Sequence, residues 1–508
     1  MASIVLAGDA GRTLLAECPD ALLQFFDTRQ ACALRLVCRE LQAAVAAYPW
    51  EDRETVIRGS IGGWRACFPR ARCANLLQLE HYGGVVRRSS VVDADFVHFV
   101  GLRELSMGGC EAVTDAAFVH LRGIRVLDMR FCDQSTITDG AFAHLAGVQK
   151  LSIAGCTQRT ITDAAFVHLR GLQCLDMGGC NQVTITDAAL MPLKGLRSLT
   201  ISDCNQLTDA AFVHMRGIPM LNMSDCRQPA ITDAAFAHLA GIHTLNMRDC
   251  TQRTITDAAF ASLKGIQTLN IGRCKQDTIT DAAFVHLAGI HTLDMNGCYQ
   301  ATITDAAFVH LAGIHTLNMS DCKQASITDA AFAPLRGIHT LRMQDCKQST
   351  ITDAAFSHLV GIQSLNMTGC TQATITDAAF VPLAGIRSLG MQGCHQPTIT
   401  DAAFASLKGI QTLNMSGCTQ ATITDAAFVH LAGIQSLKMS CCRQATITNA
   451  ALAPLKDIRS LDMSYCPQIR FTDAACKLLA VIPELNIGGC IWRSTDILAA
   501  RAGLTTFF

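Results

Sequence analysis

The sequence predicts an α/β solenoid in which each repeating unit supplies one strand and one short helix. Glycines recur every 24 residues, at Gly123, Gly147 and Gly171 and again in steps of 24 from Gly217 to Gly433. Within each unit, apolar residues follow first the alternation of a strand and then the spacing of a helix. A unit this small cannot bury its apolar side alone, so neighbouring units must stack. The expected architecture is a horseshoe with a parallel sheet on its concave face and short helices outside.

The first half of each unit predicts the strand. In one central unit, Ile314, Leu317 and Met319 have the Leu-x-x-Leu-x-Leu spacing of a short strand. Side chains alternate along a strand, so Leu317 and Met319 should face the core while Thr316 faces the other side.

The second half predicts the helix. Thr328 and Asp329 indicate its start, because a hydroxyl can cap free N–H groups and a carboxylate suits the positive end of the helix dipole. Ala331, Phe332 and Leu335 then share one side of a short helix. The glycine that opens the next unit supplies a left-handed exit.

This repeat resembles the leucine-rich repeats, in their cysteine-containing subtype, where Cys follows the strand and Ile-Thr-Asp opens the helix. The resemblance covers roughly residues 76–490, about 17 units of period 24. It implies a leucine-rich-repeat solenoid that binds other proteins. Because the ends of a solenoid need shielding, we expect residues 51–75 to form a linker and N-terminal cap and residues 491–508 a C-terminal cap.

The composition argues against some classes of partner. Lys and Arg number 41 against 42 Asp and Glu, so the global charge does not attract nucleic acid or an anionic membrane. No basic residue precedes the short apolar run near the N-terminus, and no later run approaches the length of a membrane helix. We expect an intracellular soluble protein, cytoplasmic, nuclear or both, whose 25 cysteines stay reduced.

Each unit also carries Cys, Asp and His, which raises the question of a metal site or a cysteine nucleophile. Strand and helix run antiparallel in a unit, so Cys298 should lie near Asp305, with His310 about 7 Å further along the helix. A zinc site needs four converging ligands, and a nucleophile needs a base within hydrogen-bond reach. The spacing provides neither, so we expect no metal, no cofactor and no catalytic residue.

A comparison among the units supports this interpretation. Seventeen cysteines occupy one column from Cys110 to Cys490, which predicts a ladder of small buried thiols. The helix histidine is replaced by Pro334 or Ser262 in other units, an exchange that a ligand would not tolerate. An interior proline also predicts a short or irregular helix.

Residues 1–50 lie outside the repeat and predict a small helical module. Apolar residues at helical spacing in 21–50 indicate two or three helices, the second beginning at Asp27-Thr28. The segment resembles an F-box in Phe26-Asp27, in the run from Leu34 to Arg39 and in Trp50. The opening Leu-Pro of that family corresponds either to Cys18-Pro19, if about one helical turn is missing before Asp27, or to Leu14-Leu15 without a proline.

An F-box followed by leucine-rich repeats resembles the substrate receptors of cullin-type ubiquitin ligases. The resemblance implies a non-catalytic protein whose helices hold a Skp-type adaptor and its cullin complex, and whose sheet face holds an unknown target protein. The implied adaptor-binding residues are Pro19, Leu22, Leu23, Phe26, Leu34, Leu36, Val37, Cys38 and Trp50. Two alternatives stay open: the helices only cap the solenoid, or the chain is an interaction scaffold or inhibitor with no ligase role.

Most outward positions of the predicted sheet are small and repetitive, so the few that differ should carry the specificity for the target. These positions are Arg130, Phe131, Met220, Arg248, Arg273, Arg342, Gln344, Gln392, Lys438 and Tyr465. Arginine and aromatic residues are favoured anchors at protein interfaces. We predict that Arg248 and Arg342 together recognise an acidic feature of the partner, because both project among neutral neighbours.

Overall fold

The computed structural model describes residues 23–77, 88–469 and 473–490. The chain folds as two compact units, Met1–Leu239 and Ala240–Phe508. The predicted adaptor residues Pro19 and Leu22 and the predicted cap 491–508 lie outside the described residues. Among the described residues, no helix has the length and apolar character needed to cross a bilayer.

In the described part of the first unit, helices α4 (Thr28–Leu34), α5 (Arg39–Ala47) and α6 (Ile61–Cys67) precede the repeats. Helix α4 begins at the predicted place, because the Asp27 carboxylate accepts a hydrogen bond from the Gln30 N–H at 2.7 Å while the Gln30 side chain accepts one from the Asp27 N–H at 3.1 Å. The helices pack around one apolar core, formed by Leu23, Ala31, Leu34, Val45, Trp50, Phe68 and Ala71.

The repeating strands of the first unit are parallel, and the same position pairs from one repeat to the next, as in Leu127 with Leu151. These strands are β1 (Cys73–Asn75), β3 (Glu104–Ser106), β5 (Val126–Asp128), β6 (Lys150–Ser152), β7 (Cys174–Asp176), β8 (Ser198–Thr200) and β9 (Met220–Asn222). Strand β1 lies in the segment predicted to be a linker and pairs with β3, so the sheet begins earlier than the repeat pattern indicated. A separate parallel pair joins β2 (Arg88–Val92) to β4 (Cys110–Ala112).

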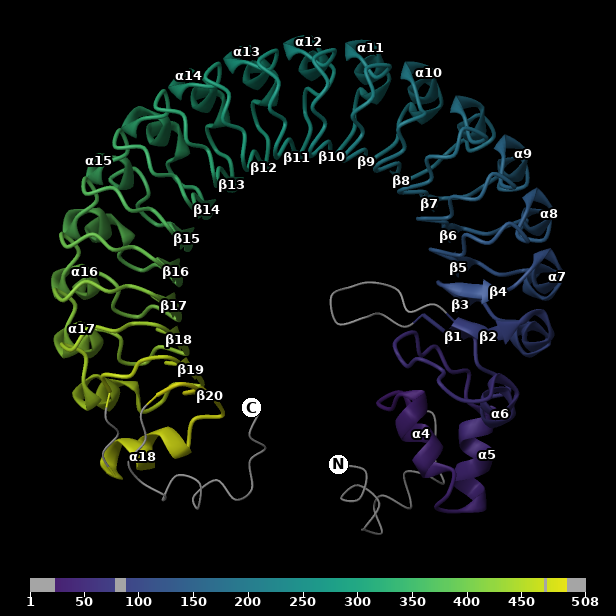
Figure 1. Cartoon of the computed structure of the whole chain (residues 1–508), viewed down its shortest axis with the longest axis horizontal. Coiled ribbons are helices and arrows are strands. Elements are labelled where there is room, and N and C mark those ends of the chain that lie inside the picture. The colour runs from purple at the N-terminus through teal and green to yellow at the C-terminus, as the bar shows by residue number, and fades with distance from the viewer. Residues whose placement is uncertain (1–22, 78–87, 470–472, 491–508) are drawn as a thin grey trace. The chain divides into compact units, whose positions relative to one another are not determined.

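Short helices follow the strands of the first unit on the side away from the sheet (Figure 1). The α-helices are α7 (Asp115–Phe118), α8 (Asp139–Phe142), α9 (Asp163–Phe166), α10 (Asp209–Phe212) and α11 (Asp233–Phe236). The 3-10 helices are η1 (Asp93–Phe99), η2 (Val119–Leu121), η3 (Asp187–Leu190), η4 (Val213–Met215) and η5 (Ala237–Leu239).

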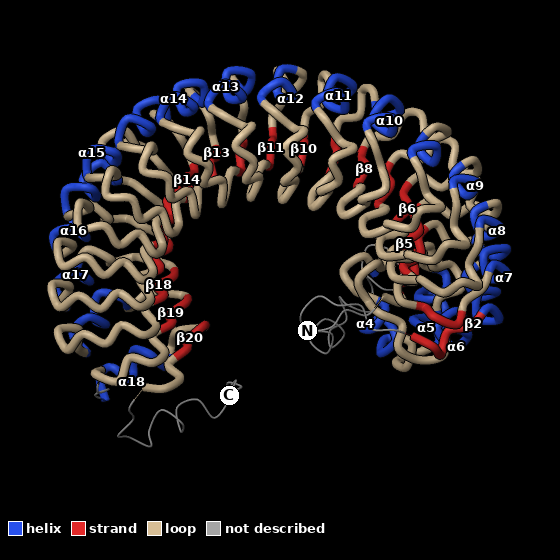
Figure 2. Tube along the Cα trace, turned by 45° about the horizontal axis from the view of Figure 1, so that its top comes forward, coloured by secondary structure: helices blue, strands red, loops and turns tan. Residues whose placement is uncertain are grey.

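The second unit repeats the same plan, with strands on one side and helices on the other (Figure 2). Its strands are β10 (Thr244–Asn246), β11 (Thr268–Asn270), β12 (Thr292–Asp294), β13 (Thr316–Asn318), β14 (Thr340–Arg342), β15 (Ser364–Asn366), β16 (Ser388–Gly390), β17 (Thr412–Asn414), β18 (Ser436–Lys438), β19 (Ser460–Asp462) and β20 (Glu484–Asn486). They pair in parallel and in order.

The helices of the second unit are equally short. The α-helices are α12 (Asp257–Ala261), α13 (Asp281–Phe284), α14 (Asp305–Phe308), α15 (Asp353–Phe356), α16 (Asp401–Ala405), α17 (Asp425–Val429) and α18 (Asp473–Ala480). The 3-10 helices are η6 (Val285–Leu287), η7 (Val309–Leu311), η8 (Asp329–Leu335), η9 (Asp377–Leu383) and η10 (Asn449–Leu455). The last three each contain a proline, Pro334, Pro382 or Pro454, which confirms the predicted irregular helix in such units.

The core lies between the strands and the helices and is built from equivalent residues of successive repeats. Leu317 and Met319 of the strand segment and Phe332 of the helix are fully buried, while Thr316 on the other face is half-buried. The predicted strand alternation is therefore confirmed. Each repeat covers the apolar side of its neighbours, which is why the stack and not the single repeat is the stable object.

The helix starts also connect consecutive repeats. Thr304 caps α14 as predicted, because its hydroxyl oxygen accepts a hydrogen bond from the Ala306 N–H at 3.2 Å. The carboxylate of Asp305 then accepts two hydrogen bonds from the following repeat, from the Thr328 N–H at 2.7 Å and from the Thr328 hydroxyl at 2.6 Å. The aspartate column thus joins repeats as well as favouring the helix dipole.

Candidate functional site

The cysteine column is part of the core. Cys298 is fully buried, and its thiol donates a hydrogen bond to the Ile271 carbonyl of the preceding repeat, with 3.0 Å between sulfur and oxygen. Burial raises the pKa of this thiol from 9.0 to about 12. A nucleophilic cysteine needs the opposite shift, because the thiolate is the reactive form. No group of three or more His, Cys, Asp or Glu in the described parts of the chain is placed to hold a metal ion.

Most of the helix histidines lie half-buried on the outer side of their repeats, while His168 and His214 are exposed. Some of them contact the preceding repeat. Nδ1 of His144 accepts a hydrogen bond from Arg122 Nε at 3.4 Å, and Nδ1 of His238 accepts one from Arg216 Nε at 3.2 Å. These contacts are surface packing between repeats.

The predicted target-binding residues fall into a few columns of the sheet face. Arg342 and Lys438 end strands β14 and β18, and Met220 begins β9. Two residues beyond a strand lie Arg130, Arg248, Gln344 and Gln392, and three residues beyond a strand lie Phe131, Arg273 and Tyr465.

The last residue of each strand has a structural task that Arg342 and Lys438 cannot perform. Most repeats place Asn or Asp there, and its side-chain oxygen accepts a hydrogen bond from the N–H two residues later, as in Asn318 with Ser320 at 3.1 Å. A guanidinium or an ammonium group has no acceptor, so these two repeats give up that bond. Both side chains are exposed instead.

The third residue after each strand has a left-handed backbone, which favours glycine or Asp. Phe131, Arg273 and Tyr465 adopt it nevertheless, with φ of 58°, 57° and 57°. Large side chains rarely tolerate this conformation, which costs on the order of 1 kcal/mol or more. Such strain gathers at functional sites, so these three residues are the strongest candidates among the predicted set.

These large side chains are accommodated by glycine in the following repeat. A methyl group on Gly155 would lie 2.5 Å from Cδ1 of Phe131, and one on Gly489 would lie 2.6 Å from Cδ1 of Tyr465. Both aromatic residues are still exposed, by 39% and 60%. Each ring therefore covers its neighbour's glycine and presents its other face to solvent.

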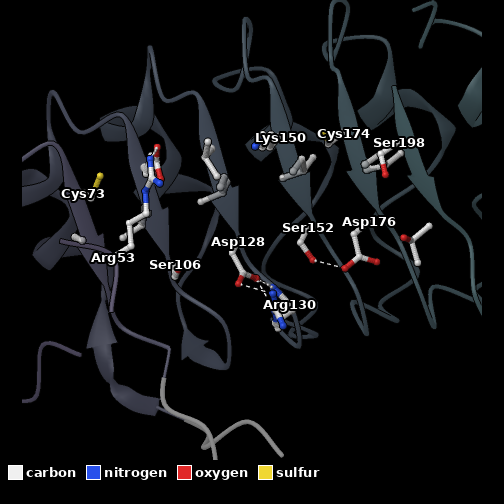
Figure 3. Close-up of a pocket in the computed structure, with 18 residues that line it drawn as sticks. Arg53, Cys73, Ser106, Asp128, Arg130, Lys150, Ser152, Cys174, Asp176 and Ser198 are labelled. Carbon is white, nitrogen blue, oxygen red and sulfur yellow. Dashed lines mark hydrogen bonds and ion pairs between the residues drawn. The ribbon is translucent and has the colours of Figure 1, made fainter. Parts of the chain in front are cut away.

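The sheet face of the first unit contains a shallow hollow of about 380 Å³ over strands β1, β3 and β5 to β8 (Figure 3). Several of its charged groups have polar partners within the same hollow. Arg130 bonds to Asp128 at 2.9 Å, Arg53 bonds to Glu104 at 2.5 Å, and the Ser152 hydroxyl donates to Asp176 at 3.0 Å. The predicted residue Arg130 is thus held by its own strand.

The second unit has a more basic hollow of about 520 Å³, formed by loops after the strands. Its lining includes Arg273, Lys275, Tyr299, Asp321 and Lys323. The Lys275 ammonium lies 4.9 Å from the centre of the Tyr299 ring, and Lys323 forms an ion pair with Asp321 at 2.9 Å. Lys275, Tyr299 and Lys323 were not predicted from the sequence, although their column, the residue after the ladder cysteine, also varies between repeats.

Arg248 and Arg342 are not brought together. They belong to the repeats of β10 and β14, which β11, β12 and β13 separate, so about 19 Å lies between those strands at the usual spacing. The expectation of neutral neighbours was wrong for Arg248, because its Nε lies 3.4 Å from the Asp249 carboxylate. A partner that bound both arginines would have to extend along several repeats.

The predicted adaptor-binding residues separate into buried and exposed groups. Leu23, Leu34 and Trp50 are buried in the helical core, and Phe26 packs against it. Leu36 and Val37 are 89% and 60% exposed.

Leu34, Val37, Cys38 and Leu41 fall at helical spacing, but no single helix contains all four. The chain leaves the helix after Leu34, and Cys38 caps the next helix, with its sulfur 3.4 Å from the Leu41 N–H. Leu36 and Val37 therefore lie in the connection between α4 and α5, where they do not contribute to the core.

Comparison with protein families gives the repeat its identity. Six copies of a family described as BspA type leucine rich repeat region match residues 113–238, 221–339 and 325–459, more than half of the chain. The chain belongs to this leucine-rich-repeat family. The matched ranges begin at residue 113 and do not include helices α4 to α6. No curated protein matches the chain.

Solved structures share the fold of this leucine-rich-repeat protein. The TLR13–ssRNA13 complex aligns with a TM-score of 0.58 and 16% identity over 80% of this chain and 62% of that chain. The Toll–Spatzle complex of Drosophila aligns with a TM-score of 0.53 and 12% identity over 87% of this chain and 64% of that chain. At these identities the likeness concerns the fold alone. The leucine-rich-repeat protein spans less than two thirds of the length of either neighbour.

Proposed function

We propose that this leucine-rich-repeat protein is a non-catalytic binding protein that recognises another protein through its sheet face. The observation that carries this proposal is the set of residues that depart from what the repeat requires. Arg342 and Lys438 replace a turn-stabilising Asn or Asp, and Phe131 and Tyr465 occupy left-handed positions at an energetic cost. Exposed aromatic and basic residues are the usual anchors of protein interfaces.

Replacing Arg342 and Lys438 by Asn tests the proposal with residues that the repeat itself uses at those positions. The double variant R342N/K438N should keep its circular dichroism spectrum, because Asn restores the turn hydrogen bond seen for Asn318. Partners captured from cells by crosslinking and mass spectrometry should be lost. Unchanged capture by this variant and by Phe131→Gly and Tyr465→Gly would refute a role for the sheet face.

We further propose that the N-terminal helices are an F-box, so that the protein is the substrate-recognition subunit of a cullin-type ubiquitin ligase in the cytoplasm or nucleus. The support is the F-box-like sequence together with the exposure of Leu36 and Val37, adjacent apolar side chains that do not contribute to the core. Apolar residues exposed side by side on a folded module are frequent docking points. Their position between α4 and α5 leaves them free to insert into an adaptor.

Co-purification tests this finer proposal. The full chain should recover a Skp-type adaptor and a cullin, while L36D/V37D and a chain without residues 1–50 should not. The exposed change Arg29→Asp serves as a charge-matched control on α4. If the unaltered chain never captures the adaptor, the competing function is favoured: a scaffold or inhibitor whose F-box-like segment only caps the solenoid.

A nucleic-acid partner is less well supported. One fold neighbour was solved with single-stranded RNA, but this chain balances 41 basic against 42 acidic residues. Binding to phosphate backbones requires an excess of basic charge on the binding surface. We therefore propose a protein target, and no nucleic acid or membrane partner.

A further inference from the structure

Three histidines on the sheet side of the second unit form a continuous stack. His291, His315 and His339 immediately precede strands β12, β13 and β14 and belong to consecutive repeats. The rings of His291 and His315 are 4.6 Å apart and within 12° of parallel, and those of His315 and His339 are 4.5 Å apart and within 11° of parallel. All three side chains are exposed.

Hydrogen bonds fix the orientation of the stack. Nδ1 of each ring is bonded to the hydroxyl of the threonine that follows it, at 3.1 Å for His291 and 3.2 Å for His315 and His339. The backbone holds the same register, since the His291 carbonyl accepts from the His315 N–H at 3.1 Å and the His315 carbonyl from the His339 N–H at 3.1 Å. The Nε2 atoms are thus left available on one edge of the row.

Parallel rings are poorly arranged to bind a metal ion, but they are close enough for a charge on one ring to affect the next. A tetrahedral metal needs nitrogen atoms that converge on one point, whereas parallel rings present their Nε2 atoms in a line. Rings stacked 4.5 to 4.6 Å apart would, by contrast, bring like charges together wherever they take up protons, so each imidazolium would oppose the next. Imidazole is the side chain whose charge changes in mildly acidic solution, so the stacked geometry links the charge of this row to the acidity of the solution.

The charged groups near the row do not cancel the charge that it would gain in acid. Asp294 and Arg342 lie at the ends of the neighbouring strands β12 and β14 and have opposite charges. The Asp294 carboxylate is engaged by the Asn296 N–H at 2.9 Å and by Asn318 Nδ2 at 3.0 Å. In the same column the flanking repeats have Gln267 and Gln363, which do not titrate.

We propose that the row His291–His315–His339 binds an acidic segment of a partner protein in mildly acidic solution and releases it at neutral pH. The inference rests on the proposed function, that the sheet face binds protein, and it names the chemistry of the partner. An acidic segment fits because paired carboxylates relieve the repulsion among the three imidazolium groups. An extended segment along the stacking direction fits because the sites repeat once per strand.

Fluorescence anisotropy with a labelled decaglutamate peptide tests the proposal on the full chain. Binding should strengthen about tenfold between about pH 7.5 and about pH 5.5. If the protein takes up one proton when the peptide binds, its affinity rises tenfold for each pH unit over which that proton is taken up. In H291Q/H315Q/H339Q this change should disappear. Glutamine occupies the same column at Gln267 and Gln363, so the variant should fold normally.

The helix-side variant H286Q/H310Q/H358Q removes the same number of histidines from the other side of the unit, and it should keep the pH dependence. An unchanged pH dependence in H291Q/H315Q/H339Q, or none in the unaltered chain, would overturn the proposal. Stronger binding of a labelled single-stranded oligouridylate than of decaglutamate at about pH 5.5 would overturn the assignment to an acidic protein segment. The R342N/K438N experiment measures partner capture at neutral pH, whereas the histidine experiment measures how peptide binding changes with pH. The two results therefore distinguish a failure of the proposed protein-binding function from a failure of the proposal for the histidine row.

Discussion

Single residues reveal where this regular chain departs from its own rule. The left-handed position after each strand is Gly in many repeats and Asp in several others, while Phe131, Arg273, Cys441 and Tyr465 are exceptions. Aspartate tolerates this backbone better than a bulky side chain because its short polar group can bond locally. The exceptions therefore cost stability without adding to the core, and partner binding is the role that we propose for Phe131 and Tyr465 among them.

Phe131→Gly should stabilise the protein by about 1 kcal/mol, because glycine adopts a φ of 58° without strain. Urea unfolding followed by circular dichroism measures the change. Phe131→Ala is the matched control, since it removes the ring but keeps the strained backbone. Equal stability of the two variants would show that strain at Phe131 is negligible.

The neighbouring glycine is the second half of this arrangement. Gly155→Ala should destabilise by about 2 kcal/mol, because alanine disfavours a φ of 70° and its methyl group would meet the Phe131 ring. Gly147→Ala shares the positive φ but meets no neighbouring atom, so it should cost less. Identical losses for both variants in urea unfolding would exclude contact with the ring as a contributor.

Protonation of the stacked histidines should also be visible in stability. Desolvation and then the charges of His339 and His291 lower the pKa of His315 below its ordinary 6.5. The folded state thus binds protons less readily than the unfolded chain, so stability is complete above about pH 6.5 and is lost as the pH falls below it. H315Q should show a smaller drop in urea midpoint between about pH 7.5 and about pH 5.5 than the unaltered chain. A larger drop would contradict the stacking repulsion.

At the scale of elements, the hydrogen bonds between successive helix starts hold the outer side together. The Asp305 carboxylate satisfies the Thr328 backbone and hydroxyl groups of the next repeat, and Asp281 does the same for Thr304. Since each helix has little more than one turn, its own hydrogen bonds cannot stabilise it alone. The Asp–Thr hydrogen bonds between repeats supply the stabilisation that the hydrogen bonds within the short helices do not.

Asp305→Ala should destabilise by about 2 kcal/mol, because Thr328 loses the charged acceptor of two hydrogen bonds. Chemical unfolding at neutral pH measures the loss. Asp277→Ala is a fitting control, since that aspartate is exposed and the next repeat has Ala301 at the same position, so its removal should cost less than about 0.5 kcal/mol. A cost as small for Asp305 would mean that the inter-repeat contact is dispensable.

The sequence predicted features that repeat within a unit better than features that arise between units. Alternation identified Leu317 and Met319 as core residues, and the Thr-Asp pair located the helix starts. The second bond of Asp305, the stacking of His315 and the basic hollow around Arg273 depend on how one repeat lies on the next. The spacing of residues along the sequence does not show how one repeat aligns with the next. Val37 falls at helical spacing from Leu34 but lies in the turn after α4, because the same spacing fits a helix and the turn that ends it.

At the scale of the whole molecule, many repeats contain the same titratable group, the buried thiol of the cysteine column. Thiols in this column are buried against the carbonyl groups of preceding repeats, as for Cys132, Cys298 and Cys418. Burial raises the pKa of each of these three to about 12 from 9.0. The neutral thiol is therefore the form that the folded protein retains, in repeat after repeat.

This predicts alkaline unfolding. Because the folded pKa lies above the unfolded one, the unfolded chain releases protons first, so the stabilising contribution is complete below about pH 9 and falls as the pH rises toward 12. Each thiol contributes up to about 1.4 kcal/mol of lost stability per pH unit, and the repeats add their losses. The circular dichroism signal should therefore be lost between about pH 9 and about pH 11, while the ultraviolet absorbance of the thiolates rises over the same range. Cys298→Ala removes one titrating thiol, so the free energy of unfolding should fall less steeply with pH, by the contribution of one proton. Thiolate absorbance that rises while the circular dichroism stays constant would mean that the thiols ionise within the folded solenoid, and the burial of the column would then not be what controls its chemistry.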